Sequence, residues 1–185
     1  MQYFKPNMRV SGNWDSVIEK LPYFSCSDYD LKDAITACSI KSASGKVEDL
    51  YKSEKGDEPK NYHYTLLSDI PLLRSFIEIF KFDTTRIRIF KQEPKHSTPM
   101  HIDKDDSNII RMWMALNEDE GFKFFFGKDK EEVQLQTGEI LFFNPNYLHG
   151  AINLSNKPRY TLNICGIPNK WIKDILEIKY KIIYV

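Results

Sequence analysis

The chain has only three cysteines, which lie far apart and form no CxxC pair. Their odd number and wide spacing argue against a disulfide framework and against a cysteine zinc site. No segment approaches the roughly 18 consecutive apolar residues of a membrane span, and the first residues lack the basic and apolar regions of a signal peptide. These absences predict reduced thiols and a cytoplasmic protein that does not associate with membranes.

Charge of one sign is not in excess, because 26 lysine and arginine residues balance 26 aspartate and glutamate residues. Because the chain has no overall basic field, nucleic-acid binding is not expected. Because it has no acidic tail, a disordered role is not expected either. A small molecule or a peptide is the expected partner. The sequence also contains no phosphate-binding glycine loop, no GxSxG elbow and no HExxH motif, so these common signatures of function are absent.

Arginine is scarce, since only six of the 26 basic residues are arginine and the rest are lysine. The sequence thus uses lysine wherever a positive charge alone suffices. An arginine here is expected where its planar, forked guanidinium is needed. The six are Arg9, Arg74, Arg86, Arg88, Arg111 and Arg159.

The length of 185 residues predicts one domain, residues 1–185, with a core that needs no disulfide or metal support. The first part of the chain mixes helix and strand signals. Before residue 84 we expect a short helix capped by Asn13 or Asp15 and ending at Leu21, a strand over 34–40, an exposed loop over 41–62, and a helix capped by Ser68.

From residue 84 onward, short runs of β-type residues alternate with turn residues. Seven such runs in about eighty residues predict an antiparallel sandwich or small barrel over 84–166, with the early helices packed outside it. A short helix and an unassigned apolar tail follow. The seven runs are 85–92, 108–116, 122–127, 131–136, 139–144, 150–154 and 159–165.

Two histidines and a carboxylate stand at positions that suit a metal site. If His101 and Asp103 lie on an extended segment, their side chains point to the same face, because strand periodicity is two. His149 begins another strand 48 residues later and would complete a facial set of ligands. Such a set leaves coordination positions open and suits iron(II).

An arginine follows the second histidine at a useful distance. Arg159 lies ten residues after His149, across a turn that we expect to return the chain on the neighbouring strand. On that strand it shares a face with Thr161 and Asn163. An inward guanidinium there could bind a carboxylate through paired, charge-assisted hydrogen bonds, which lysine could not form.

These segments resemble the iron(II)/2-oxoglutarate oxygenases of the double-stranded β-helix (jelly-roll, cupin-like) fold, especially the aspartyl/asparaginyl β-hydroxylase-like branch. The resemblance extends over about residues 84–166. The matching pieces are His101-Ile102-Asp103, Arg111-Met112-Trp113-Met114, Gly138-Glu139, His149-Gly150-Ala151-Ile152-Asn153 and Arg159-Tyr160.

The resemblance implies a mainly β fold, iron(II), 2-oxoglutarate and dioxygen as cofactor and cosubstrates, and release of succinate and CO2. It implies that His101, Asp103 and His149 are the metal ligands and that Arg159 binds the distal carboxylate of 2-oxoglutarate. Arg111 would assist at the 1-carboxylate or at the substrate. Because some relatives lack the carboxylate ligand, Asp103 favours hydroxylation over halogenation.

Other conspicuous residues have simpler interpretations. His63 and His96 are expected at surface or packing positions, with His96 in a polar loop. Asp105 and Asp106 are expected to be solvated, and the phenylalanines of 122–126 and 142–143 to belong to the core. Arg86 and Arg88 share a strand face with Phe90, and both a cavity position and a solvated one stay open.

Two other functions stay open beside the oxygenase. A cupin-like metalloenzyme could use similar ligands without an oxoacid, and it would not need Arg159 as a carboxylate clamp. A non-catalytic binding domain could keep the same fold, since a fold alone does not decide function.

Overall fold

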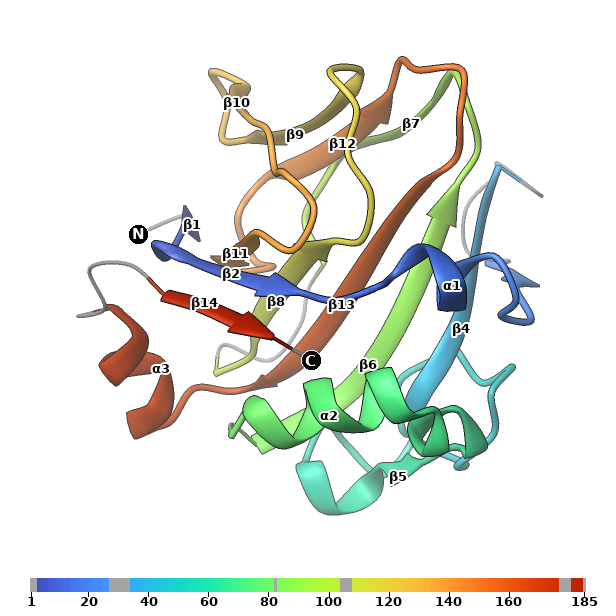
Figure 1. Ribbon diagram of the computed structural model, residues 1–185. Coiled ribbons are helices and arrows are strands. Elements are labelled where there is room, and N and C mark those ends of the chain that lie inside the picture. Colours follow the sequence, from blue (N-terminus) through green and yellow to red (C-terminus); the bar gives the residue numbers. More distant parts are fainter. Residues whose placement is uncertain (1–2, 27–33, 82, 104–107, 177–180, 185) are drawn as a thin grey trace.

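The computed structural model describes residues 3–26, 34–81, 83–103, 108–176 and 181–184. Two sheets face each other, and helices flank one of them (Figure 1). The elements are β1 (Tyr3–Phe4), β2 (Met8–Ser11), α1 (Asp15–Ile18), β3 (Phe24–Ser25), β4 (Ile35–Ser42), η1 (Pro59–Asn61), β5 (His63–Tyr64), η2 (Leu66–Asp69), α2 (Pro71–Ile79), β6 (Asp83–Gln92), β7 (His96–His101), β8 (Ile110–Ala115), β9 (Phe122–Phe126), β10 (Glu131–Val133), β11 (Ile140–Phe143), β12 (His149–Asn153), β13 (Arg159–Ile167), α3 (Lys170–Leu176) and β14 (Lys181–Tyr184).

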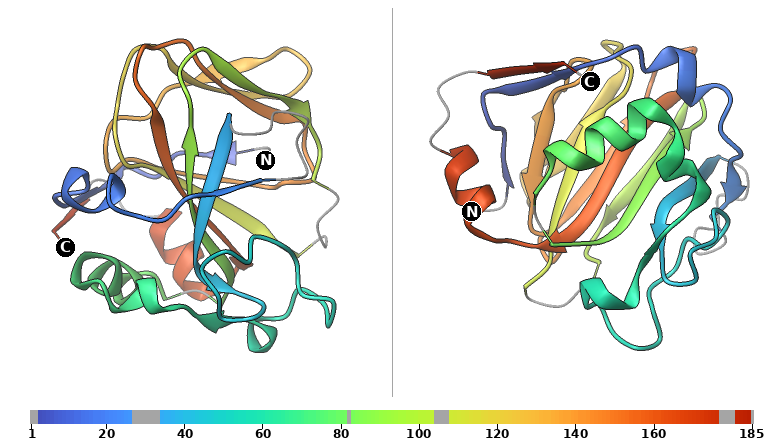
Figure 2. Two further views of the ribbon diagram at one scale, coloured as in Figure 1. Left: turned by 90° about the vertical axis from the view of Figure 1, so that its right-hand side faces the viewer. Right: turned by 60° about the horizontal axis from the view of Figure 1, so that its bottom comes forward.

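The large sheet contains eight of the described strands, in the order β1-β11-β8-β13-β6-β4-β3, with β5 beside β4. Its outer face is covered by helix α2, which lies across the strands in Figure 2. Leu73 and Phe76 of α2 belong to one apolar core with Ile87, Ile89 and Leu162 of the sheet. Because both faces are covered, nearly every residue of β13 is buried, as expected for a sheet packed on two sides.

The small sheet has the order β10-β9-β12-β7 among the described strands. Along β9, Phe124 and Phe126 are buried and the residues between them are partly exposed, the alternation of a sheet with one face toward solvent. The buried rings pack against Trp113, Leu141 and Phe143 of the large sheet. The prediction of a mainly β jelly-roll fold with helices outside it is therefore confirmed.

All seven predicted β runs correspond to strands, but the helix boundaries differ from those predicted. Helix α2 starts at Pro71, a favourable first helical residue, and Ser68 lies in η2, where its hydroxyl donates to Thr65 O at 2.8 Å. The prediction of Ser68 as the cap was wrong. Helix α1 stops at Ile18, short of the predicted end at Leu21. No described helix combines the length and the apolarity needed to cross a bilayer.

The segment predicted as an exposed loop, 41–62, is partly buried. Its first two residues belong to β4, and Leu50 and Tyr62 are 5% and 4% exposed. The prediction of exposure holds for most of the segment and was wrong for its buried residues, because the segment folds back over β4 and β6. The C-terminal tail, which the sequence left unassigned, forms β14 and pairs in parallel with β2.

Candidate metal centre and active-site cavity

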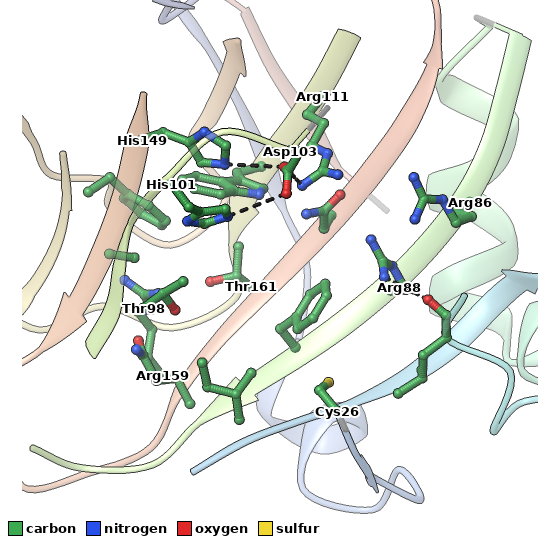
Figure 3. A pocket seen from close by; sticks show the side chains of 18 of the residues that line it. Cys26, Arg86, Arg88, Thr98, His101, Asp103, Arg111, His149, Arg159 and Thr161 are labelled. Atoms are coloured by element: carbon green, nitrogen blue, oxygen red, sulfur yellow. Dashed lines mark hydrogen bonds and ion pairs between the residues drawn. The ribbon is translucent and has the colours of Figure 1, made fainter. Parts of the chain in front are cut away.

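A cavity of about 640 Å³ opens between the two sheets (Figure 3). The large sheet contributes side chains of β6, β8 and β13, and the small sheet contributes β7, β9 and β12. Arg159, Thr161 and Asn163 all line it, which confirms that they share a face. The other lining residues are Cys26, Ile35, Leu50, Tyr51, Lys52, Arg86, Arg88, Phe90, Gln92, Thr98, His101, Ile102, Asp103, Arg111, Trp113, Phe124, His149 and Ala151.

The two histidines and the aspartate proposed from the sequence meet at this cavity. His101 ends β7 and His149 begins β12, and the two are direct partners in the small sheet. Asp103 lies just beyond β7, where its backbone N–H donates to Pro145 O at 3.0 Å. His101 Nε2 lies 3.4 Å from Asp103 Oδ1, and His149 Nε2 lies 3.3 Å from Asp103 Oδ2.

These spacings suit a metal ion. One potential ligand atom from each residue lies within 4.8 Å of the others. Two ligand atoms about 2.1 Å from a common metal, at right angles, are about 3.0 Å apart, close to the observed distances. The site could therefore hold a divalent cation with little movement of the side chains.

The backbone orients both imidazoles for this role. The Nδ1 atom of His101 lies 2.8 Å from Pro99 O, and the Nδ1 atom of His149 lies 2.8 Å from Tyr147 O. A carbonyl oxygen accepts a hydrogen bond only from a nitrogen that carries a proton, so Nδ1 carries a hydrogen, and each Nε2 of a neutral imidazole presents a lone pair toward Asp103. Two lone pairs and a carboxylate that face one another need a cation between them, either protons or a metal.

The groups around Asp103 favour the ionised form of its carboxylate. Burial raises its pKa, but hydrogen bonds from the two imidazoles and the charge of Arg111 outweigh burial and bring the pKa well below its ordinary value. Arg111, on β8, places its Nη1 against Asp103 Oδ2. The pKa of His101 is raised, chiefly because Asp103 accepts a hydrogen bond from its ring. Geometry that attracts a proton in this way also attracts a metal.

Arg159 enters the cavity from the other sheet. Strand β13 pairs with β6 and β8 rather than with β12, so the expectation that it neighbours the His149 strand was wrong: the turn before Arg159 crosses between sheets. The guanidinium lies 4.6 Å above the Phe124 ring, and Nη1 is 3.3 Å from Lys123 O. Burial lowers its pKa to about 9.

Comparison with known proteins identifies the family. Residues 53–167 match the family described as Aspartyl/Asparaginyl beta-hydroxylase. The chain belongs to the aspartyl/asparaginyl β-hydroxylase family. Membership places it among enzymes of the oxygenase class. No curated protein matches its sequence.

Solved structures resemble this family member at low identity. A crystal structure of an oxidoreductase of the 2OG-Fe(II) oxygenase family from Burkholderia pseudomallei is 14% identical, with a TM-score of 0.53, over 82% of this chain and 75% of that one. A protein with a double-stranded β-helix domain from Klebsiella pneumoniae is 18% identical, with a TM-score of 0.37, over 45% and 68%. The first likeness supports a shared fold.

The sequence left the positions of Arg86 and Arg88 undecided and did not reveal that residues 50–52 form part of the cavity wall. Arg86 and Arg88 are 5% and 8% exposed and line the cavity, so the solvated alternative was wrong. The signal was available, since both alternate with Ile87 and Ile89 on a strand buried on both faces. The cavity wall formed by residues 50–52 could not be found from a polar segment without periodicity.

The remaining histidines lie outside the metal cluster, which contains only His101, Asp103 and His149 among the described residues. His96 is in strand β7 rather than in a loop, and its Nδ1 lies 2.8 Å from Pro94 O. His63 is exposed in β5. Asp105 and Asp106 lie outside the described residues.

Proposed function

We propose that this chain is an iron(II)- and 2-oxoglutarate-dependent oxygenase that hydroxylates an amino acid, peptide or other small molecule. In this proposal His101, Asp103 and His149 bind iron(II), and Arg159 binds the distal carboxylate of 2-oxoglutarate. The observation that carries it is the pair of imidazole Nε2 atoms turned toward Asp103, in one cavity with the buried Arg159. Family membership supports the same chemistry.

Iron(II), when bound with 2-oxoglutarate and dioxygen, supplies the oxidising chemistry, and succinate and CO2 are the products. The chain's own residues orient and shield these partners. Pro99 O and Tyr147 O hold the two imidazoles in the ligating tautomer. Arg111 holds the Asp103 carboxylate in place and stands where it can also meet the 1-carboxylate of the cosubstrate or the substrate.

Apolar side chains between the two ends of the cavity exclude water from the reacting groups. Trp113 packs on Phe124 with ring centroids 4.6 Å apart, and Trp113 lies edge-on to His149 at 5.8 Å. Excluding water strengthens the ion pairs inside the cavity. The ionised carboxylate of Asp103 in the ligand set supports hydroxylation over halogenation.

We also propose that residues 1–185 act as one oxygenase domain whose jelly-roll core is 84–166. The early strand β2 and helices α1 and α2 support this, because their apolar residues share one core with the sheet. A reducing, cytoplasmic location is consistent with the burial of all three cysteines.

The test is the substitution Arg159→Lys, which keeps the charge and removes the fork. One charged hydrogen bond contributes about 1.5 to 3 kcal/mol, so affinity for 2-oxoglutarate should fall roughly ten- to a hundredfold. Iron affinity should stay at the parent value. The measurement is titration of 2-oxoglutarate into iron-loaded, oxygen-free protein, followed by the metal-to-ligand absorption band.

Two controls sharpen this test. Arg74→Lys, at an exposed position of α2, should bind 2-oxoglutarate like the parent. The shortened acid 2-oxobutyrate lacks the distal carboxylate, so parent and Arg159→Lys should bind it equally. Equal 2-oxoglutarate affinity in parent and Arg159→Lys would remove Arg159 from the site and favour a cupin-like metalloenzyme. Absence of the band in the parent would favour the alternative of a non-catalytic binding domain with the same fold.

A further inference from the structure

A second buried arginine lies in the cavity, away from the first. Arg88 is on β6, where it is paired with Asn163, whereas Arg159 is paired with Gln92 at the end of the same strand. Four residues of strand separate the two positions, which corresponds to about 13 Å between their Cα atoms. Figure 3 shows Arg88 and Arg159 in different parts of the pocket, with the metal cluster in a third.

The surroundings of Arg88 resemble those of Arg159. Its guanidinium lies 4.9 Å from the Phe90 ring centroid, and Nη1 donates to Leu50 O at 2.8 Å. Its Nε is buried and has no hydrogen-bond partner among the described residues. No described carboxylate lies within ion-pair distance of it, so its charge is buried without the partner that normally offsets desolvation.

The two other cations at this end of the cavity differ from Arg88. Lys52 and Arg86 both approach Asp57, at 3.8 Å and 4.0 Å. Burial, reinforced by the positive charge of Arg86, lowers the pKa of Arg88. A hydrogen bond to one carbonyl explains how Arg88 holds the 50–52 segment, but it leaves Nε without a partner and the charge uncompensated.

The cavity as a whole has an excess of positive charge. Among the described lining residues, five are cationic and a single one is a carboxylate: Lys52, Arg86, Arg88, Arg111, Arg159 and Asp103. A concave wall of one sign attracts ligands of the opposite sign. The volume of about 640 Å³ falls within the range of about 300 to 1,000 Å³ typical for drug-sized ligands, which leaves room for a substrate beside a small dicarboxylate.

An amide at the other end of the same strand face, opposite Arg159, is also unsatisfied. Gln92 is 3% exposed, and neither its Nε2 nor its Oε1 has a hydrogen-bond partner among the described residues. It lines the cavity two positions beyond Phe90. Buried amides almost always have partners, so Gln92 marks the β6 wall, from Arg88 to the position opposite Arg159, as one that faces polar ligands.

We propose that Arg88 anchors a second anion subsite, which binds an oxyanion group of the substrate, a carboxylate or a phosphate, while Arg159 holds the cosubstrate. The substrate is then a small acid whose charged end lies on β6 and whose reacting carbon is directed toward the metal cluster. The role as a substrate site rests on the proposed function. The anion site itself does not.

The first experiment counts anion sites without turnover. Malonate and inorganic phosphate are titrated by calorimetry into metal-free parent protein and into Arg88→Met, Arg159→Met and Arg74→Met. We expect two sites in the parent and in Arg74→Met, and one site in each of the other two variants. The better of the two anions identifies the oxyanion class. Two unchanged sites in Arg88→Met, or no site in the parent beyond the one that Arg159→Met removes, would overturn the proposal.

A milder variant covers the case in which Arg88→Met fails to fold. Arg88→Lys keeps the charge and a donor for Leu50 O, and it loses the fork. Its affinity at the second site should fall about tenfold, the effect of one charged hydrogen bond. Affinity equal to the parent's would contradict the proposal. If the parent has the site that Arg88→Met removes but has no site that Arg159→Met removes, the result would count against the proposed function and not against this subsite.

The second experiment measures succinate formation with iron(II), ascorbate and 2-oxoglutarate against matched pairs of acids and their amides, and of phosphate monoesters and their alcohols. The charged member of a pair should stimulate turnover in the parent. In Arg88→Lys its KM should rise about tenfold, with the KM for 2-oxoglutarate unchanged. Preference for the neutral members would sink the subsite while leaving the oxygenase activity established.

Discussion

The two sheets contribute different chemistry to one cavity. The small sheet supplies both histidines of the metal cluster from a single strand pair, β7 and β12. The large sheet supplies the cavity arginines from β6, β8 and β13. The difference follows from burial: the large sheet is covered on both faces and can isolate charges from water, whereas the small sheet has one face toward solvent. Metal binding and anion binding should therefore be separable by mutation.

Two contacts join these functions across the cavity. Arg111 of the large sheet meets Asp103, which extends from the small sheet, and Arg159 of the large sheet lies over Phe124 of the small sheet. At these contacts a change in one sheet should affect the other.

The largest effect is expected from His149→Ala, which removes a proposed ligand from the small sheet. A four-ligand structural zinc site contributes about 10 to 16 kcal/mol, or roughly 2.5 to 4 kcal/mol per ligand, which is about seventyfold to nearly a thousandfold in affinity. Iron(II) affinity, measured by anaerobic competition with a chelator, should fall by this factor. The control is His96→Ala on β7, which should bind iron like the parent. Parent-like binding by His149→Ala would exclude it as a ligand.

The second effect concerns the joint between the sheets. Asn153, at the end of β12, is fully buried and donates to Gln92 O, Glu93 O and Lys157 O at 3.1, 3.2 and 2.9 Å. Its Oδ1 accepts from the Ser155 backbone and hydroxyl. Asn153→Ala leaves several buried groups unsatisfied, so the free energy of unfolding should fall by about 2 to 3 kcal/mol.

Chemical denaturation measures this loss, and exposed Asn156 supplies the control. Asn156→Ala should change stability by less than about 0.5 kcal/mol. If Asn153→Ala proves equally mild, the two sheets are not joined through this side chain. The contacts of Asn153 place it at the end of β12, where the chain turns toward β13.

The metal cluster was visible in the sequence because its determinants are local. Strand alternation brings His101 and Asp103 to one side, and short runs of β residues locate β12 and β13, although no predicted run covered β7. The arginine spacing added Arg159. All four side chains do line one cavity. The local pattern assigned the Arg159 strand to the wrong sheet. Whether the turn before Arg159 stays in one sheet or crosses to the other depends on tertiary packing.

Features that depend on distant parts of the chain could not be predicted. Leu50 lies under Arg88 because the polar segment folds over β6, and β14 pairs with β2 across almost the whole sequence. Nothing in the composition of either segment indicates its partner. The prediction of the α2 cap failed for a local reason, because the apolar periodicity could not distinguish a helix that starts at Pro71 from one capped by Ser68.

A third prediction tests how closely the small sheet holds its two histidines. A Cβ on Gly150 would lie 2.9 Å from Met100 Sδ and 3.0 Å from Thr98 O. The methionine end can move, but the backbone of Thr98 cannot move without displacing β7 and hence His101. Gly150→Ala should lower iron affinity roughly tenfold, the lower end of the effect of groups that position ligands.

In the same Gly150→Ala variant, malonate binding at the arginines of the large sheet should stay at the parent value. Ser97→Ala, at an exposed position of the same strand pair, is the control and should leave iron affinity unchanged. A loss of malonate binding equal to the loss of iron would show that the sheets do not act separately.

The smallest effect is expected from Phe124→Leu, which alters a contact between the sheets without replacing a charged residue. The Phe124 ring supports the Arg159 guanidinium at 4.6 Å, and such a cation–π contact contributes about 0.5 to 1 kcal/mol, or more when desolvated. Without the ring the guanidinium loses its orientation, so 2-oxoglutarate affinity should fall roughly three- to fivefold. Iron affinity should not change, because Phe124 does not contact a proposed ligand directly.

Phe125 provides the matched control, since it lies between the buried rings of β9 and faces away from the cavity. Phe125→Leu should leave 2-oxoglutarate affinity at the parent value, which separates the cation–π contact from a general loss of aromatic packing. The two variants are compared by the same anaerobic titration that follows the absorption band. If both weaken 2-oxoglutarate equally, the effect arises from the small sheet as a whole, and the ring beneath Arg159 has no separate role in orienting it.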